Sequence, residues 1–282
     1  FFLLQYDKVE VLKTDFFMKK GIEFLEQQFG VKWDWDAFWK NAEMYNESSR
    51  CMIEKWDVNC TEHPQVCGAA LALQREYEFM AAACMDKFML KTDRRVTKMM
   101  LKGYEQDKAA NAPQPKYRCL VWACPAHYYT NFTYWTQHCW GVTCVNDMEA
   151  MLSYQPITIG DKEQALADLV RCYEKMMMRS HTNGGYVNLL DECWKMCEKF
   201  HTNIVIMYDH VSCKNVGGLH GLFEDQARER GIHLIWIPHD VMDPRTVSRR
   251  EMREAFSQYM VTVLNEKPLD PTIVEFDDSM AY

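Results

Sequence analysis

Two apolar runs in the second half of the chain decide the fold class: NIVIMY at 203–208 and IHLIWI at 232–237. Both runs are rich in β-branched and aromatic residues, and neither alternates with polar residues, which is typical of parallel strands buried on both faces. A run at 117–123 and a weaker one at 142–145 are further strand candidates. Helical patterns separate and follow these runs, at about 130–139, 162–180, 187–200, 216–230 and 247–265.

Strands that alternate with helices predict an α/β protein with a doubly wound parallel sheet of the flavodoxin or Rossmann-like type and flanking helices. Residues 1–112 instead predict a mostly helical segment, with Gly30 as the C-cap of its first helix. The linker NAPQP at 111–115 divides the two parts, so we expect domains at 1–112 and 113–282. The opening FFLL at 1–4 has no initiator Met and is typical of a strand interior, which suggests that further sequence precedes it.

The composition excludes several classes of protein. With 282 residues, 48% of them hydrophobic and 26% charged, the chain can bury a core and is not disordered. The formal net charge is -8 and no basic block stands out, which disfavours a nucleic-acid or anionic-membrane partner. The longest apolar runs are too short to span a bilayer. We therefore expect a cytoplasmic protein.

The 12 cysteines leave two interpretations open. An even number and three glycosylation sequons, at Asn46, Asn59 and Asn131, would suit a secreted, disulfide-bonded protein. Reduced thiols are favoured, because the chain is long enough not to need disulfides and shows no signal peptide. Cys193 and Cys197 also share one helix face, as buried thiols would. No C-x-x-C occurs, so a structural zinc site is not indicated.

The turn after the 203–208 run carries the sharpest functional signal. Its sequence, DHVSCKNVGG at 209–218, places Cys213 beside Lys214 and ahead of two glycines and a helix. Backbone N–H groups, a helix N-terminus and a lysine all stabilise a thiolate, so we interpret Cys213 as a ligand or nucleophile. The alternative is a buried turn cysteine with no role. A dinucleotide site is disfavoured, because the G-x-G-x-x-G spacing is absent.

Ligands of doubly wound sheets bind at the carboxyl ends of the strands. Besides the Cys213 turn, this rule indicates the turns Cys124–His127 and His239–Arg245. The second of these contains Asp243-Pro244-Arg245, for which local turn chemistry and a role in the crevice are both open.

The stretch Asn203–Leu264 resembles the C-terminal half-domain of the 2-hydroxyacyl-CoA dehydratase and benzoyl-CoA reductase subunit family. That family carries a Ser/Gly-Cys-Lys/Arg turn after one strand and a D-x-x-D-P-R-like turn before its final helix. Here these are the Cys213 turn and Asp240–Arg245. The segment Ile22–Arg50 looks like the family's helical block, including its Asn46-Glu47 pair.

The resemblance implies an oxygen-sensitive [4Fe-4S] cluster held by three cysteines per subunit. Cys213 matches the third of these and is the metal and cofactor ligand that the resemblance assigns. The other two would lie upstream of Phe1, and Cys124 falls where the family has a small residue. Loop N–H groups of Val216–Gly218 would tune the cluster.

By the same resemblance, the chain would be a subunit of an anaerobic lyase that removes water from a 2-hydroxyacyl-CoA by radical chemistry and gives an enoyl-CoA. The implied partners are a homologous subunit, in a heterodimer, and an ATP-dependent iron–sulfur activator protein that supplies one electron. The resemblance assigns no catalytic residue in this sequence. A benzoyl-CoA reductase-type subunit and a non-catalytic electron-relay or structural subunit are the alternatives.

Overall fold

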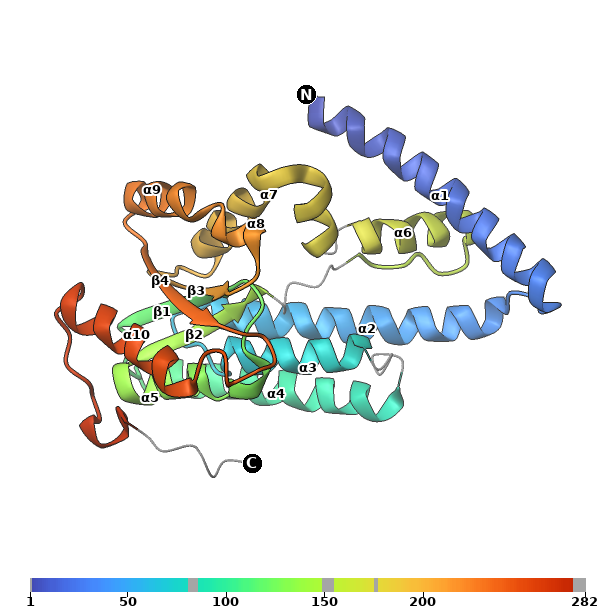
Figure 1. The fold of residues 1–282 in the computed structure, drawn as a ribbon. Helices are drawn as coiled ribbons and strands as arrows, with labels where there is room; N and C mark the ends of the chain where they lie inside the picture. The colour runs from blue at the N-terminus through green and yellow to red at the C-terminus, as the bar shows by residue number, and fades with distance from the viewer. Residues whose placement is uncertain (1, 81–85, 149–154, 175–176, 276–282) are drawn as a thin grey trace. The chain divides into compact units, whose positions relative to one another are not determined.

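A computed structural model describes residues 2–80, 86–148, 155–174 and 177–275 (Figure 1). Its helices are α1 (Phe2–Phe29), α2 (Trp35–Cys60), α3 (Gly68–Met80), α4 (Lys87–Ala109), α5 (Phe132–Trp140), α6 (Lys162–Glu174), α7 (Met177–Lys199), α8 (Lys214–Gly217), α9 (His220–Arg230) and α10 (Arg249–Thr262). Short 3-10 turns lie at His127–Tyr129 and Pro271–Ile273. The strands are β1 (Tyr117–Trp122), β2 (Val142–Asp147), β3 (Ile204–His210) and β4 (His233–His239).

The chain divides into two compact units, and each combines three stretches of sequence. The first unit comprises residues 1–54, 77–98 and 152–185, and the second comprises 55–76, 99–151 and 186–282. The division into domains at 1–112 and 113–282 stays a prediction. Every helix in the described ranges is too short or too polar to cross a lipid bilayer.

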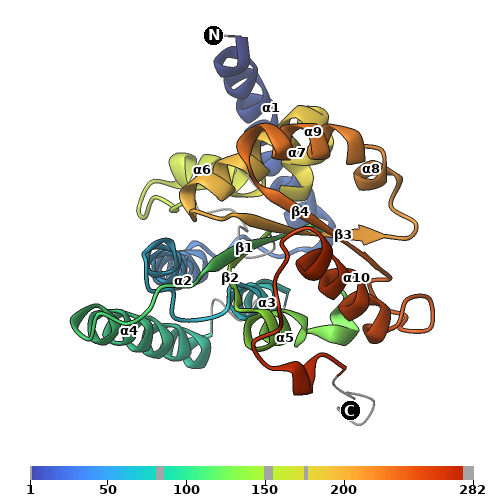
Figure 2. The same ribbon diagram turned by 90° about the vertical axis from the view of Figure 1, so that its left-hand side faces the viewer.

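The second unit contains the sheet that the apolar runs predict. Its four strands are all parallel and lie in the order β2-β1-β3-β4. Helices α5 and α10 cover one face, and α9 and the second half of α7 cover the other, with the short α8 beside them (Figure 2). Both faces are therefore shielded from water, and residues such as Val205 and Ile206 are fully buried. The predicted α/β fold class is confirmed.

Several helix ends follow directly from local sequence. Gly30 has a left-handed backbone (φ +65°) and its N–H donates to the Glu26 carbonyl at 3.0 Å, as expected of a C-cap. Helix α10 begins with a capping box between Ser248 and Glu251. The strand expected for the FFLL stretch is wrong, because α1 begins at Phe2. Helix-forming residues continue without a break to Gly21, and a short apolar run alone does not distinguish strand from helix.

Two close contacts fix the elements around the sheet. A Cβ on Gly68, the first residue of α3, would lie 2.4 Å from the Cα of Asn146 in β2, so only glycine permits this approach. At the start of β1, the Arg118 guanidinium donates to the carbonyls of Asn59 (2.7 Å), Thr61 (2.8 Å) and Phe200 (3.0 Å). Arg118 thereby joins the C-terminal end of α2 and the residue after α7 to the sheet.

Candidate functional site

The carboxyl ends of the strands form one edge of the sheet, and the chain changes direction there. After β1 it passes to α5 on one face and then to β2, whereas after β3 it passes to α8 and α9 on the opposite face (Figure 2). The gap between β1 and β3 is therefore a topological switch point, where doubly wound sheets form a ligand crevice. Cys124 follows β1 and Cys213 follows β3, so both cysteines lie at this edge.

Cys213 lies in the short turn that follows β3. Its N–H donates to the His210 carbonyl at 2.9 Å, and its carbonyl accepts from the Gly217 N–H at 3.2 Å. It occupies the N-cap position of α8 with an extended backbone (φ −85°, ψ 95°), but its side chain caps no N–H group. The thiol is half-buried and not in a disulfide, so it is available as a ligand.

The helix that follows Cys213 is shorter than the sequence predicts. Instead of one helix over 216–230, α8 has four residues and α9 begins at His220. The N–H groups of Gly217 and Gly218 donate back to the carbonyls of Cys213 (3.2 Å) and Lys214 (3.0 Å). These two N–H groups therefore close the short helix, and the tuning of a cluster by the N–H groups of Val216–Gly218 stays a prediction.

Three aromatic rings pack at the ends of β3 and β4. The His239 ring lies 5.0 Å from the Tyr208 ring and 5.4 Å from the His210 ring. His239 is fully buried, and neither ring nitrogen has a partner with good hydrogen-bond geometry, although backbone groups of Cys124 and Asp209 lie close by. Burial, followed by repulsion from His210, lowers the pKa of His239 to about 4, so the ring is neutral near pH 7.

A second histidine pairs with a carboxylate at the end of β3. The Nε2 atom of His220, at the start of α9, lies 3.3 Å from Oδ2 of Asp209. The His220 ring also stacks on Trp236, with the ring centroids 3.6 Å apart. This pair joins the two ends of the segment that contains Cys213.

The turn after β1 has a strained backbone. Ala123 has φ +67°, a conformation that costs a non-glycine residue about 1–2 kcal/mol. The Sγ of Cys124 lies 3.8 Å from Nε2 of His127, and the His127 N–H donates to the Val241 carbonyl at 2.9 Å. The structure thus brings the turns after β1 and β4 together, as the sequence predicts.

The Asp240–Arg245 turn is held in place by hydrogen bonds between its own residues. Asp240 accepts hydrogen bonds from the N–H groups of Met242 and Asp243, each at 2.9 Å. Arg245 donates to the Asp243 carboxylate through Nε (2.9 Å) and a terminal nitrogen (2.6 Å), which lowers the pKa of Asp243 to about 2. Of the two interpretations left open, these contacts support local turn chemistry.

A small cavity lies where β1, β2 and β3 end. Its volume is about 20 Å³, which is room for about one water molecule. The lining includes Asp147, Tyr208 and Thr133, all buried, together with His127. Burial raises the pKa of Tyr208, so its phenol keeps its proton. No local sequence pattern indicates that Asp147 lines a cavity, because its burial depends on the packing around it.

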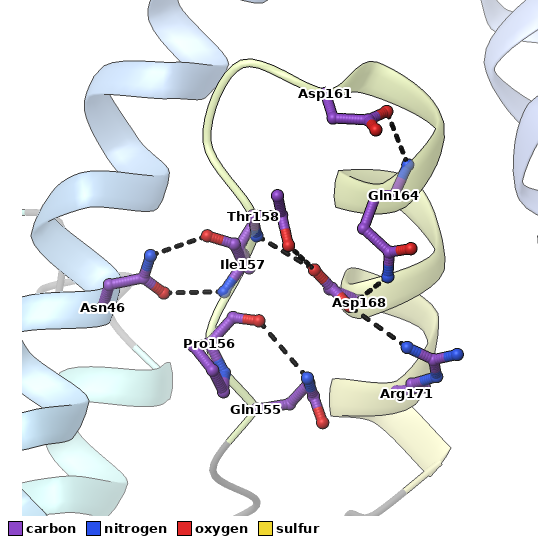
Figure 3. A network of polar contacts seen from close by, with 9 residues as sticks. All are labelled: Asn46, Gln155, Pro156, Ile157, Thr158, Asp161, Gln164, Asp168 and Arg171. Carbon is purple, nitrogen blue, oxygen red and sulfur yellow. Dashed lines mark hydrogen bonds and ion pairs between the residues drawn. The ribbon is translucent and has the colours of Figure 1, made fainter.

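The Asn46-Glu47 pair has a structural role in the first unit. The Asn46 side chain donates to the Ile157 carbonyl and accepts from its N–H, both at 2.8 Å (Figure 3). Glu47 accepts two hydrogen bonds from Arg94, at 2.5 and 2.7 Å. These two residues therefore hold neighbouring segments in place.

Asp168 on α6 fixes the segment that contains Ile157. Its carboxylate accepts from the N–H (2.9 Å) and hydroxyl (2.7 Å) of Thr158 and from Gln164 (2.8 Å) (Figure 3). Burial raises the pKa of Asp168, but these hydrogen bonds outweigh it and the net pKa is lowered. The carboxylate is thus a structural anion rather than a proton donor.

The described residues give no support to a disulfide framework. None of the eleven cysteines among them is in a disulfide, and Cys84 lies outside the described ranges. The Asn59 sequon is unsuited to a glycan, because its buried amide donates to the carbonyls of Val66 (2.7 Å) and Val145 (3.0 Å). Within the same ranges, no three His, Cys, Asp or Glu side chains gather closely enough to hold a metal ion.

Comparison with known families gives a match over most of the chain. The family model described as 2-hydroxyglutaryl-CoA dehydratase, D-component, matches residues 8–260. No curated protein matches the chain. The matched range includes the helical block with Asn46, the Cys213 turn and the Asp240–Arg245 turn.

Proposed function

The chain belongs to the family of the 2-hydroxyglutaryl-CoA dehydratase D-component, and we propose that it is a cytoplasmic subunit of an iron–sulfur 2-hydroxyacyl-CoA dehydratase. The proposed reaction is the elimination of water from a 2-hydroxyacyl-CoA to give an enoyl-CoA. Two observations support it: the family match over residues 8–260, and a half-buried free thiol at the switch point of the sheet.

Among the described residues, Cys213 could serve as one ligand of a cluster, but these residues do not form a complete cluster site. Cys213 has the required chemistry, since a thiolate is the usual protein ligand of iron–sulfur clusters. It lies at the end of a buried strand with its backbone fixed by His210 and Gly217. Because no three potential ligands gather among the described residues, other residues must supply the remaining thiolates.

A bound cluster would supply the one-electron chemistry that side chains lack, since the β-hydrogen of a 2-hydroxyacyl thioester is too weakly acidic for ordinary elimination. The role of this chain would be to hold the Cys213 thiolate in place. The Val211 N–H donates to the His239 carbonyl at 3.1 Å, which attaches the Cys213 turn to β4. His210 accepts from the Ser212 N–H at 3.1 Å and fixes the turn's middle residue. The neutral His239 adds no positive charge there.

The proposal includes two protein partners: a homologous subunit, and an ATP-dependent iron–sulfur activator that delivers one electron. The described ranges offer a single thiol ligand at the candidate site, which also suits a subunit that shares a cluster or relays electrons. A non-catalytic electron-relay subunit is therefore the second candidate function.

The direct test is an anaerobic assay of the chain co-expressed with a related subunit. 2-Hydroxyglutaryl-CoA is added with activator, ATP and reductant, and enoyl-CoA is measured by mass spectrometry. We expect product only when ATP and activator are both present. Product formed without ATP or reductant would refute the radical proposal. Activity that does not need this chain's Cys213 would refute both the catalytic and the relay role.

A further inference from the structure

A pair of thiols lies far from the carboxyl edge, near the amino ends of β3 and β4. Cys193 and Cys197 are one turn apart on α7 and are 0% and 2% exposed. Two residues that line the cleft beside this pair lie just ahead of the strands: Thr202 is two residues before β3, and Ile232 is one residue before β4. The candidate site uses neither cysteine, so the pair has no role in the proposed function.

One of the two thiols borders an open cleft. The cleft has a volume of about 630 Å³, and its lining includes Cys197, Trp194, Arg230 and Thr202. The Arg230 guanidinium lies 5.1 Å from the centre of the Trp194 ring, which places a positive charge beside the thiols. Cys197 is therefore the thiol of the pair that lies next to the cleft, although it is only 2% exposed.

The surroundings favour a thiolate at Cys197. A hydrogen bond from Cys193 lowers the pKa of Cys197, and Thr202 and Arg230 act in the same direction. Burial raises the pKa of Cys193, which is the donor in this contact. The two sulfur atoms are thus in contact, and the thiolate form is favoured at Cys197 and the thiol form at Cys193.

The helix geometry disfavours a disulfide between them. Cβ atoms four residues apart on a helix are separated by about 5–6 Å, whereas a disulfide needs about 3.5–4.5 Å. Helix α7 is non-helical only at Gly185, so it is regular at the two cysteines. An atom inserted between the sulfurs relieves this mismatch, and a direct S–S bond does not.

We propose that Cys193 and Cys197 form a two-coordinate site for a soft monovalent metal ion, with copper(I) as the representative ion. Thiolates select such ions. The described residues offer no third clustered His, Cys, Asp or Glu, which suits two-coordination and disfavours a four-coordinate ion such as zinc. Binding replaces the thiol protons and releases them to solvent, with no change in oxidation state. The two thiolates and one ion carry a net negative charge, which Arg230 balances.

A competition titration tests the site. The reduced full-length protein is titrated anaerobically with copper(I) buffered by bicinchoninate, and bound copper is counted per chain. We expect C193A/C197A to lose one equivalent relative to the native protein. R230Q keeps both sulfurs and should bind that equivalent about 10–100-fold more weakly, as for other residues that support a metal ligand. X-ray absorption should show two sulfur neighbours.

The matched control is C67A. Cys67 is also a buried thiol in contact with another cysteine, Cys144, but neither of these two lines the cleft. This variant should keep the copper equivalent. If C193A/C197A fails to fold by circular dichroism, the single variants C193S and C197S and the R230Q variant provide the same test. Unchanged copper binding in folded C193A/C197A or C197S, or an equal loss in C67A, would overturn the proposal.

Discussion

Replacement of Gly68 by alanine should destabilise the second unit. The new Cβ would lie 2.4 Å from both the N and Cα atoms of Asn146 and 2.7 Å from the carbonyl carbon of Val145. These are backbone atoms of β2, so no side chain can rotate away and α3 must move by about 1 Å to reach ordinary van der Waals contact. The stability of this variant therefore reports how closely α3 packs on β2.

The magnitude follows from two opposing effects. Overpacking of this kind costs about 1–3 kcal/mol, and alanine in a helix recovers at most about 1 kcal/mol relative to glycine. We expect a net loss of about 1–2 kcal/mol in the free energy of unfolding. For a protein of this size, that corresponds to a fall in Tm of about 2–8 °C.

The assay is thermal unfolding followed by circular dichroism, with G221A as the matched control. Gly221 lies in α9, and a Cβ there would meet nothing within 4 Å, so the same substitution should stabilise by up to about 1 kcal/mol. The two variants should therefore change Tm in opposite directions. A Tm for G68A equal to or above that of the native protein would refute the close packing of α3 on β2.

Three further predictions follow from buried polar groups. The H239F variant removes the buried imidazole. Because the folded-state pKa of His239 is lowered from 6.5 to about 4, native stability falls as pH drops from 6.5 to 4, and urea titrations should show this fall reduced in the variant. R118M loses three hydrogen bonds to carbonyls and should lower the free energy of unfolding in urea by at least about 3 kcal/mol. The control R245M, at a largely exposed ion pair, should lower it by under about 1 kcal/mol. Equal losses would contradict the structural role of Arg118. N46A should cost about 2 kcal/mol by removing both contacts to Ile157, and amide hydrogen exchange at 157–158 should rise; unchanged exchange would count against this role.

The sequence predicts the sheet well because its strands are buried on both faces. Continuous runs such as 203–208 leave no solvent-facing positions, so the signal does not depend on register. The same argument locates the carboxyl edge, since every residue that directly follows a run lies there. Cys213 could be placed at the candidate site on this basis alone.

The remaining features depend on contacts between distant residues. The FFLL stretch and the helix after Cys213 were misassigned because short segments lack a decisive period. His239 was assigned to a turn, although it is the last residue of β4 and is covered by Tyr208 and His210. No local pattern indicates that a polar residue at a strand end will be buried.

The most direct measurement of the central claim is the iron content of C213S, purified anaerobically with its related subunit. Cys60, also a half-buried thiol, provides the matched control C60S. Iron and acid-labile sulfide are counted per heterodimer, and circular dichroism checks that each variant is folded. We predict that C213S loses the iron and sulfide of one cluster while C60S keeps both. Full iron and sulfide in folded C213S would contradict the assignment of Cys213 as a cluster ligand.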